Sequence, residues 1–361
     1  SSQTEQDTRR FADFCRIPVF DPSSPEEAYK MIGEAFEYSE KYNTPVLFRP
    51  TTRVCHAYAS IDNCDSPSPK KYEGFVKDSK KWVIFPRLSF ANHIMIEKRN
   101  VEIGKDFSTY SANKAEGVNS EKAVVTSGIS YAYTKECLKD YPDVKLIKIA
   151  TAYPFPEDFV LSSLEGAKEV LCIEELSPFI EEQILKLAGK HGLHLRVSGK
   201  LDGKVQAGGE NSTDKIAAIL GDFLGKDFTA DGYDLSDAPA LPVRPPVLCA
   251  GCPHRASFYA VKQAMKGRKA YFCGDIGCYT LGNAMPLDMV DTCLCMGAGI
   301  TMAQGFNHTD SDGVCFGFVG DSTFFASGIT GVVNAVHNNA DMILCVLDNS
   351  TTAMTGHQSH P

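Results

Sequence analysis

The chain has 361 residues, a mass of 39.4 kDa and a net charge of −9. Its length suits two or three domains, and its 43% hydrophobic and 22% charged residues are ordinary for a folded globular protein. The acidic balance excludes a non-specific nucleic-acid binder, and no apolar run reaches the ~18 residues of a membrane span.

The cysteines and the first residues indicate the redox compartment of the chain, and its two ends indicate whether it is a fragment. The 13 cysteines are odd in number, so they cannot all pair within the chain. Three of them, Cys172, Cys315 and Cys345, stand in apolar runs, where a reduced thiol behaves as a small hydrophobic side chain. No segment of the secretory type opens the chain, so we expect a reducing, cytoplasmic location. A start without methionine and an end just after a strand and loop predict an internal fragment.

The first segment has the pattern of a helix that leads into a short strand. Residues 21–27 supply a cap, an early proline and acidic first-turn residues. Five apolar residues then recur at helical spacing: Ala28, Met31, Ile32, Ala35 and Phe36. Residues 46–48 predict a short buried strand, and the polar stretch at 60–81 predicts a linker or surface excursion.

The rest of the chain alternates strands with helices. In the middle unit we expect strands at 123–126, 144–149, 170–173 and 193–197 and helices at 130–139 and 181–189. The Gly-, Asp- and Pro-rich residues 225–246 indicate an interdomain linker. In the last unit we expect a helix at 256–265 and strands at 270–273, 314–319 and 342–347. This alternation predicts an α/β protein with parallel sheets.

The strongest chemical signal surrounds Asp321 and Asn349. One apolar strand runs into Gly320, Asp321 and Ser322, and a second ends just before Asn349, 28 residues after Asp321. One strand–helix–strand crossover has that length, so both side chains should meet at the carboxyl edge of a parallel sheet, where ligands bind. Their oxygens suit Mg²⁺, and the helix start behind Ser322 suits a diphosphate. The alternative is an Asp helix cap beside an unrelated Asn turn.

Three cysteines form a second, weaker signal. Cys249 and Cys252 are two residues apart, and Cys278 follows after one helix and one strand. Three thiolates at these positions could converge on a shared metal or cluster, for which no fourth ligand is assigned. The alternative is that the cysteines line a cofactor pocket without any metal.

Small residues and histidines complete the candidates. The small residues around Gly297 either let a helix begin close to a planar ring or serve tight helix packing. His254 lies inside the cysteine motif, which favours a functional role. For His357 and His360 we expect either contact with the substrate or a role in ordering their loop. For His56 and His93 we expect surface or core packing.

Five motifs occur in order along the chain: residues 249–255, 274–279, 296–300, 320–324 and 348–358. Together they resemble the large (alpha) subunits of the indolepyruvate ferredoxin oxidoreductase family, which are thiamine-diphosphate 2-oxoacid:ferredoxin oxidoreductases. The thiamine motif of such enzymes is Gly-Asp-Gly followed one crossover later by Asn, and Ser322 here replaces the second Gly. The resemblance covers nearly the whole chain. It implies an α/β fold with transketolase-like thiamine-diphosphate-binding domains, parallel sheets and flanking helices.

The resemblance also implies an order of domains. Residues 1–60 would be the C-terminal part of a pyrimidine-binding domain, 61–120 a linker or excursion, and 121–227 a transketolase C-terminal-like domain. Residues 228–246 would form a second linker, and 247–361 a diphosphate-binding domain that is incomplete at its C-terminus. The glutamate that activates the aminopyrimidine, and a ferredoxin-like domain with [4Fe–4S] clusters, are expected outside these residues.

The resemblance assigns roles to single residues. Asp321 and Asn349 would be side-chain Mg²⁺ ligands, and Thr351 would be a ligand through its backbone carbonyl. The cofactor would be surrounded by Cys252, Gly277, Cys278, Gly297, Gly320, Asp321, Ser322 and Asn349. His254 is the catalytic candidate beside them. Related pyruvate enzymes hold a proximal cluster with cysteines like Cys249, Cys252 and Cys278.

The implied reaction is oxidative decarboxylation of an aryl 2-oxo acid, with indole-3-pyruvate favoured. Coenzyme A would take the acyl group and ferredoxin the electrons, and the chain would act as a dimer of pairs with a smaller beta subunit. A non-oxidative thiamine-dependent decarboxylase or carboligase is the alternative within the same cofactor class. A non-catalytic zinc- or cluster-binding scaffold is a third hypothesis, which leaves the spacing of Asp321 and Asn349 unexplained.

Overall fold

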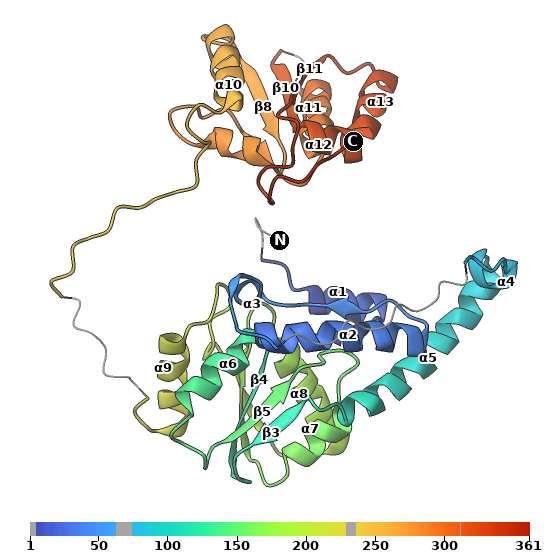
Figure 1. Cartoon of the computed structure of the whole chain (residues 1–361), viewed down its shortest axis with the longest axis vertical. Helices are drawn as coiled ribbons and strands as arrows, with labels where there is room; N and C mark the ends of the chain where they lie inside the picture. Colours follow the sequence, from blue (N-terminus) through green and yellow to red (C-terminus); the bar gives the residue numbers. More distant parts are fainter. Residues whose placement is uncertain (1–4, 63–73, 229–235, 311) are drawn as a thin grey trace. The chain divides into compact units, whose positions relative to one another are not determined.

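The computed structural model describes residues 5–62, 74–228, 236–310 and 312–361, which divide into two compact units, Ser1–Asp234 and Leu235–Pro361 (Figure 1). Each unit is built around its own sheet, in which most or all neighbouring strands are parallel. Within the described ranges, no helix combines the length and apolar character needed to cross a membrane. All cysteines in those ranges are free thiols.

The first unit contains a five-stranded sheet in the order β3-β5-β4-β6-β7. Its strands are β3 (Lys114–Glu116), β4 (Lys122–Ser127), β5 (Lys145–Ile149), β6 (Glu169–Ile173) and β7 (Arg196–Ser198). All neighbours are parallel except β3, which pairs antiparallel with β5. β3 lies within the segment that the sequence indicated as a linker. The strand expected at 193–197 begins later, because the N–H of Leu193 donates to Ala188 and closes the preceding helix.

Four helices cover the two faces of this sheet: α6 (Gly128–Cys137), α7 (Glu157–Ser163), α8 (Phe179–His191) and α9 (Thr213–Leu224). Successive strand residues point to opposite faces, so Val124 packs in the cluster that contains α6 and α9, whereas Val125 packs in the cluster that contains α7 and α8. Both faces of β4 are therefore buried, as its unbroken apolar pattern predicts.

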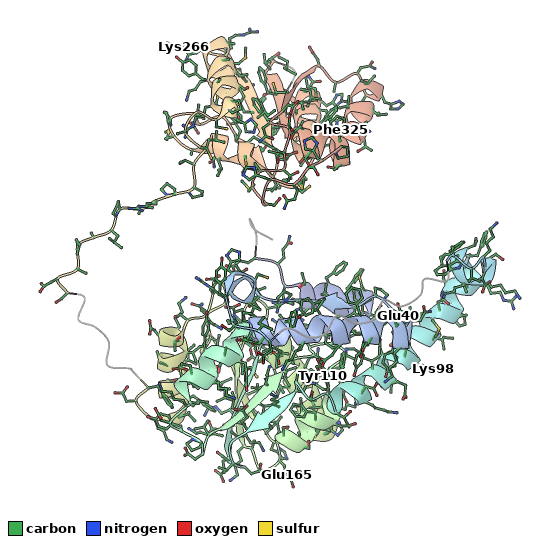
Figure 2. The ribbon with its side chains drawn as sticks, viewed as in Figure 1. Glu40, Lys98, Tyr110, Glu165, Lys266 and Phe325 are labelled. Atoms are coloured by element: carbon green, nitrogen blue, oxygen red, sulfur yellow. The ribbon has the colours of Figure 1, made fainter. Side chains whose placement is uncertain are left out.

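The N-terminal part of the first unit packs on this sheet, apart from the short helix Ser79–Trp82, which has no buried residue. It consists of α1 (Thr8–Cys15), β1 (Val19–Phe20), α2 (Pro25–Tyr42), β2 (Leu47–Phe48), α3 (Thr52–His56), α4 (Ser79–Trp82) and α5 (Pro86–Ser108). The expected capped helix is confirmed, because the Ser24 side chain accepts the N–H of Glu27 at the start of α2. Its buried face is narrower than predicted: Met31 and Ala35 are buried, but Phe36 is 69% exposed. Tyr110, labelled in Figure 2, follows α5 and donates a hydrogen bond to Glu34 of α2.

An ion pair fills the crevice where this sheet reverses its strand order. In open α/β sheets that crevice, here between the ends of β4 and β6, is the usual place for a ligand. Arg9 of α1 occupies it: the guanidinium donates to Glu174 at 2.7 Å and to the hydroxyl of Ser127 at 3.4 Å. Arg9 is 1% exposed. The chain's own side chain therefore stands where a ligand would otherwise bind.

The second unit contains a four-stranded parallel sheet in the order β11-β10-β8-β9. Its strands are β8 (Ala270–Gly274), β9 (Thr292–Cys293), β10 (Val314–Gly320) and β11 (Met342–Leu347). Its α-helices are α10 (Pro253–Ala264), α11 (Ala298–Thr309), the single turn α12 (Asp321–Thr323) and α13 (Ile329–His337), and a 3-10 helix covers Cys278–Asn283. A π turn at Phe324–Gly328 joins α12 to α13, and Figure 2 labels Phe325 within it. The strands and helices predicted for this unit are thus confirmed within a few residues.

Gly299 lets α11 pack directly on the sheet. A Cβ at this position would lie 2.6 Å from the carbonyl oxygen of Phe318, whereas nothing lies within 4 Å of a Cβ at Gly305 of the same helix. We expect Gly299→Ala to destabilise the second unit by more than about 2 kcal/mol, because backbone must move. Gly305→Ala is expected to stabilise it by about 0.5–1 kcal/mol. Hydrogen exchange of the β10 amides measures both, and equal effects would contradict this packing.

Candidate functional site

The carboxyl ends of three neighbouring strands meet at one edge of the second sheet. Asp275 directly follows β8, Asp321 follows β10, and Asp348 and Asn349 follow β11. Gly320 and Leu347 are paired in register, so the residues after them must lie close together. The N–H of Asn349 donates to the Asp321 carboxylate at 3.1 Å. The structure therefore brings Asp321 and Asn349 side by side.

Asp321 is held as a charged group by backbone amides. Its carboxylate accepts the N–H groups of Ser322 at 2.8 Å, Asn349 at 3.1 Å and Ser350 at 2.7 Å. Burial raises the pKa of Asp321, but these bonds outweigh it and leave the pKa below its ordinary value. Nε2 of His360 also lies 3.1 Å from this carboxylate. The result is a fixed negative charge at the sheet edge.

A cavity of about 100 Å³ opens beside Asp321. Many of the residues singled out from the sequence line it: His254, Gly277, Cys278, Gly320, Asp321, Ser322, Asn349 and Thr351. Cys249, Cys252 and Gly297 are not among its lining residues. Further lining residues that the sequence did not single out include Ile276, Tyr279, Met296, Thr323 and Met354.

The ring of Tyr279 packs against two of the motif glycines. A Cβ at Gly277 would lie 2.3 Å from this ring, and a Cβ at Gly320 would lie 2.6 Å from it. The Tyr279 hydroxyl donates to the carbonyl oxygen of Ile276 at 3.1 Å. Both glycines are therefore required by a close approach, and Tyr279 sets the spacing between the ends of β8 and β10. The missed signal was the tyrosine directly after Cys278 in the motif.

The three candidate cluster cysteines differ in exposure. Cys249 is exposed, whereas Cys252 and Cys278 are half-buried. Burial raises the pKa of the Cys278 thiol, and the nearby thiols of Cys252 and Cys249 raise it further. Over the ranges that the structure covers, no group of three or more His, Cys, Asp or Glu side chains is placed to hold a metal ion. The cluster assignment stays a prediction.

His254 is 3% exposed and lies edge-on to Tyr279, with ring centroids 6.4 Å apart. Burial lowers the pKa of His254, and the charge of Asp321 opposes that shift only in part. The imidazole is therefore neutral at pH 7. Of the other candidate histidines, His360 is half-buried at the site, whereas His56, His93 and His357 are exposed.

Asp275 is buried at the end of β8, and its pH dependence can be predicted. Burial raises its pKa to about 6, above the ordinary 3.8. The unfolded chain therefore releases this proton first, so the second unit should lose up to about 3 kcal/mol of stability as pH rises from 4 to 6. The N-terminus of α11 favours the charged form and makes this an upper bound. In Asp275→Asn that loss should disappear. Urea unfolding of both proteins across this range tests it, and parallel pH profiles would contradict it.

Residues 275–361 match the family model described as thiamine pyrophosphate enzyme, C-terminal TPP binding domain. The indolepyruvate oxidoreductase subunit IorA of Methanothermobacter thermautotrophicus is 38% identical over 370 aligned residues, which cover 100% of this chain and 59% of that protein. The subunit of the same name from Thermococcus kodakarensis is 36% identical, with the same coverage of both proteins.

Two solved structures share 12% and 14% sequence identity with the chain. One is a split-gene transketolase in an inactive β4 tetramer, with a TM-score of 0.31 over 58% of this chain and 57% of the other. The second is a 2-oxoglutarate:ferredoxin oxidoreductase from Magnetococcus marinus, with a TM-score of 0.38 over 57% of this chain and 42% of the other. At these scores neither establishes how this chain is arranged. Along its whole length, however, the chain is similar to the indolepyruvate oxidoreductase subunits IorA, and it spans about three fifths of the length of these relatives.

Proposed function

We propose that this chain is the thiamine-diphosphate-binding part of the large subunit of an indolepyruvate:ferredoxin oxidoreductase. The proposed reaction converts an aryl 2-oxo acid, with indole-3-pyruvate favoured, and coenzyme A into arylacetyl-CoA and CO₂, while ferredoxin accepts the electrons. The observation that carries the proposal is the amide-held carboxylate of Asp321 beside Asn349, inside the segment that matches a TPP binding domain.

The residues present fit magnesium and a diphosphate. The donors at this edge are oxygens, which is the ligand chemistry of Mg²⁺, and they include a carboxylate already held in its charged form. Gly320 carries no side chain, and the ring of Tyr279 occupies the space that a Cβ there would need. Asp321 and Asn349 would hold the ion with their side chains, and Thr351 with its carbonyl oxygen. Gly277, Cys278, Gly320 and Ser322 would contact the cofactor.

Thiamine diphosphate supplies the electron sink for loss of CO₂ from a 2-oxo acid. The chain's contribution is to bind the cofactor and to exclude water from the half-buried cavity. His254 is buried against Tyr279, and its lowered pKa favours the neutral imidazole, which can accept a proton at its unprotonated nitrogen. Cys252 and Gly297 do not line the cavity and would act through the segments that carry them.

The proposal includes partners. The relatives are named as subunits and are longer than this chain, which supports a multi-subunit enzyme. We expect a smaller beta subunit, a dimer of alpha–beta pairs and a cytoplasmic location. We also expect [4Fe–4S] clusters mainly outside these residues, with Cys249, Cys252 and Cys278 as candidate ligands of a proximal one.

The test is an oxygen-free assay of the complete enzyme with indolepyruvate, phenylpyruvate and pyruvate. We expect arylpyruvates to have the higher kcat/KM, and product formation to require both coenzyme A and oxidised ferredoxin. A higher kcat/KM for pyruvate would contradict the aryl specificity. Aldehyde formation without coenzyme A or an electron acceptor would instead support the non-oxidative decarboxylase.

A further inference from the structure

Asp275 connects two segments that flank the candidate site, although it does not line the cavity itself. Its side chain is fully buried at the end of β8. One carboxylate oxygen accepts the N–H of Gly297 at 2.6 Å. Gly297 is the N-cap of α11, has a φ of +89° and provides no side-chain cap of its own. The Asp275 carboxylate, which comes from another segment of the chain, therefore acts as the anionic N-terminal cap of α11.

The backbone of Asp275 fixes the second segment. Its carbonyl oxygen accepts the hydroxyl of Thr280 at 2.6 Å, and the same hydroxyl accepts the N–H of Gly277 at 3.0 Å. The thiol of Cys293 approaches this carbonyl oxygen at 3.6 Å. The short loop that carries Gly277 and Cys278 is thus held at both ends by one residue and its hydroxyl partner.

These two segments both border the cavity beside Asp321. Gly277 and Cys278 line it from the loop after β8, and Met296 lines it from the turn before α11. The other Asp275 oxygen, Oδ1, is buried and has no hydrogen-bond partner among the described residues.

We infer that Asp275 is a positioning residue for the cofactor site, a role that rests on the proposed function. It holds the loop that carries Gly277 and Cys278 in a fixed position relative to the turn at Met296 and Gly297. Both segments are therefore in place when magnesium–thiamine diphosphate binds. The side chain acts through Gly297 and the carbonyl through Thr280. Neither atom contacts the cofactor in this account.

The test measures the dissociation constant of magnesium–thiamine diphosphate by calorimetry on the complete enzyme. Asp275→Ala should weaken binding about tenfold, and Asp275→Asn, which keeps an acceptor oxygen, should stay within about threefold of wild type. Asp291→Ala is the control, because Asp291 accepts the N–H of Phe272 at 2.7 Å beside the same strand and does not border the cavity. It should leave the affinity unchanged.

Thermal unfolding of each variant separates positioning from plain stability. A lower Tm with wild-type affinity in Asp275→Ala, or equal losses in Asp275→Asn and Asp275→Ala, would overturn the inference. If Asp275→Ala does not fold, Thr280→Val should weaken binding while Thr309→Val, whose hydroxyl donates only to its own helix, should not. Unchanged affinity in Thr280→Val would then overturn it. A wild-type enzyme that binds no thiamine diphosphate would overturn the proposed function itself.

Discussion

Replacing Asp321 with alanine is expected to weaken the binding of magnesium–thiamine diphosphate by more than about a hundredfold, which corresponds to about 3 kcal/mol. The variant lacks the carboxylate that would neutralise the ion, and it leaves the N–H groups of Ser322, Asn349 and Ser350 without their acceptor. Added Mg²⁺ should not restore the affinity, because the ligand itself is gone. Calorimetry with and without excess Mg²⁺ measures the dissociation constant.

A matched control separates the loss of a metal ligand from the loss of a negative charge elsewhere in the same unit. Asp341 directly precedes β11, at the end of the strand opposite to Asn349, and its backbone N–H donates to Asn307. Asp341→Ala removes the same charge from the same unit without touching the proposed ligands. Its affinity should equal that of wild type. Wild-type affinity in Asp321→Ala would show that the ion is held elsewhere.

Replacing Arg9 with methionine is expected to destabilise the first unit by about 3–5 kcal/mol, because it leaves buried carboxylates without their partner. Arg9 pairs with Asp7 and Glu174, each at 2.7 Å and each almost fully buried. Burial raises the pKa of Glu174, and the charge of Arg9 holds it down. Without Arg9 the pKa of Glu174 rises further, so the damage should be smaller at pH 5 than at pH 8.

The neighbouring arginine is the control for this prediction. Arg10 pairs with Glu182, but its side chain is 40% exposed, so Arg10→Met should cost less than about 1 kcal/mol. Hydrogen exchange of the β4 and β6 amides reports on the first unit alone. Equal protection in the two variants would show that the ion pair does not support the crevice between these strands.

The parallel strands β4, β6, β10 and β11 could be predicted because each contains an apolar run, which carries its own signal. β4, β6 and β10 are buried along most of their length, whereas β11 is an edge strand with Ile343 and Val346 exposed. β3 is only three residues long, with two exposed positions and a Lys-Ala-Glu sequence, so no periodicity marks it. Its place follows from pairing with β5, which a local pattern does not contain.

The candidate site likewise has features that the sequence predicts and features that depend on the tertiary structure. The length of one crossover fixes Asp321 next to Asn349, and that is visible in the sequence. Tyr279 and Asp275 act through contacts that depend on how two loops fold back on β8, and their partners lie up to 44 residues away. The Arg9–Glu174 pair spans 165 residues and joins elements that no local signal connects. Long-range polar contacts of this kind are set by the tertiary structure alone.

The most direct test of the central claim is a crystal structure of the complete enzyme grown with Mn²⁺ in place of Mg²⁺ and with thiamine diphosphate. We expect an anomalous peak bonded to oxygens of Asp321 and Asn349 and to the carbonyl of Thr351, with the diphosphate completing the shell. A peak at any other position, with a diphosphate that does not contact this edge of the second sheet, would contradict it.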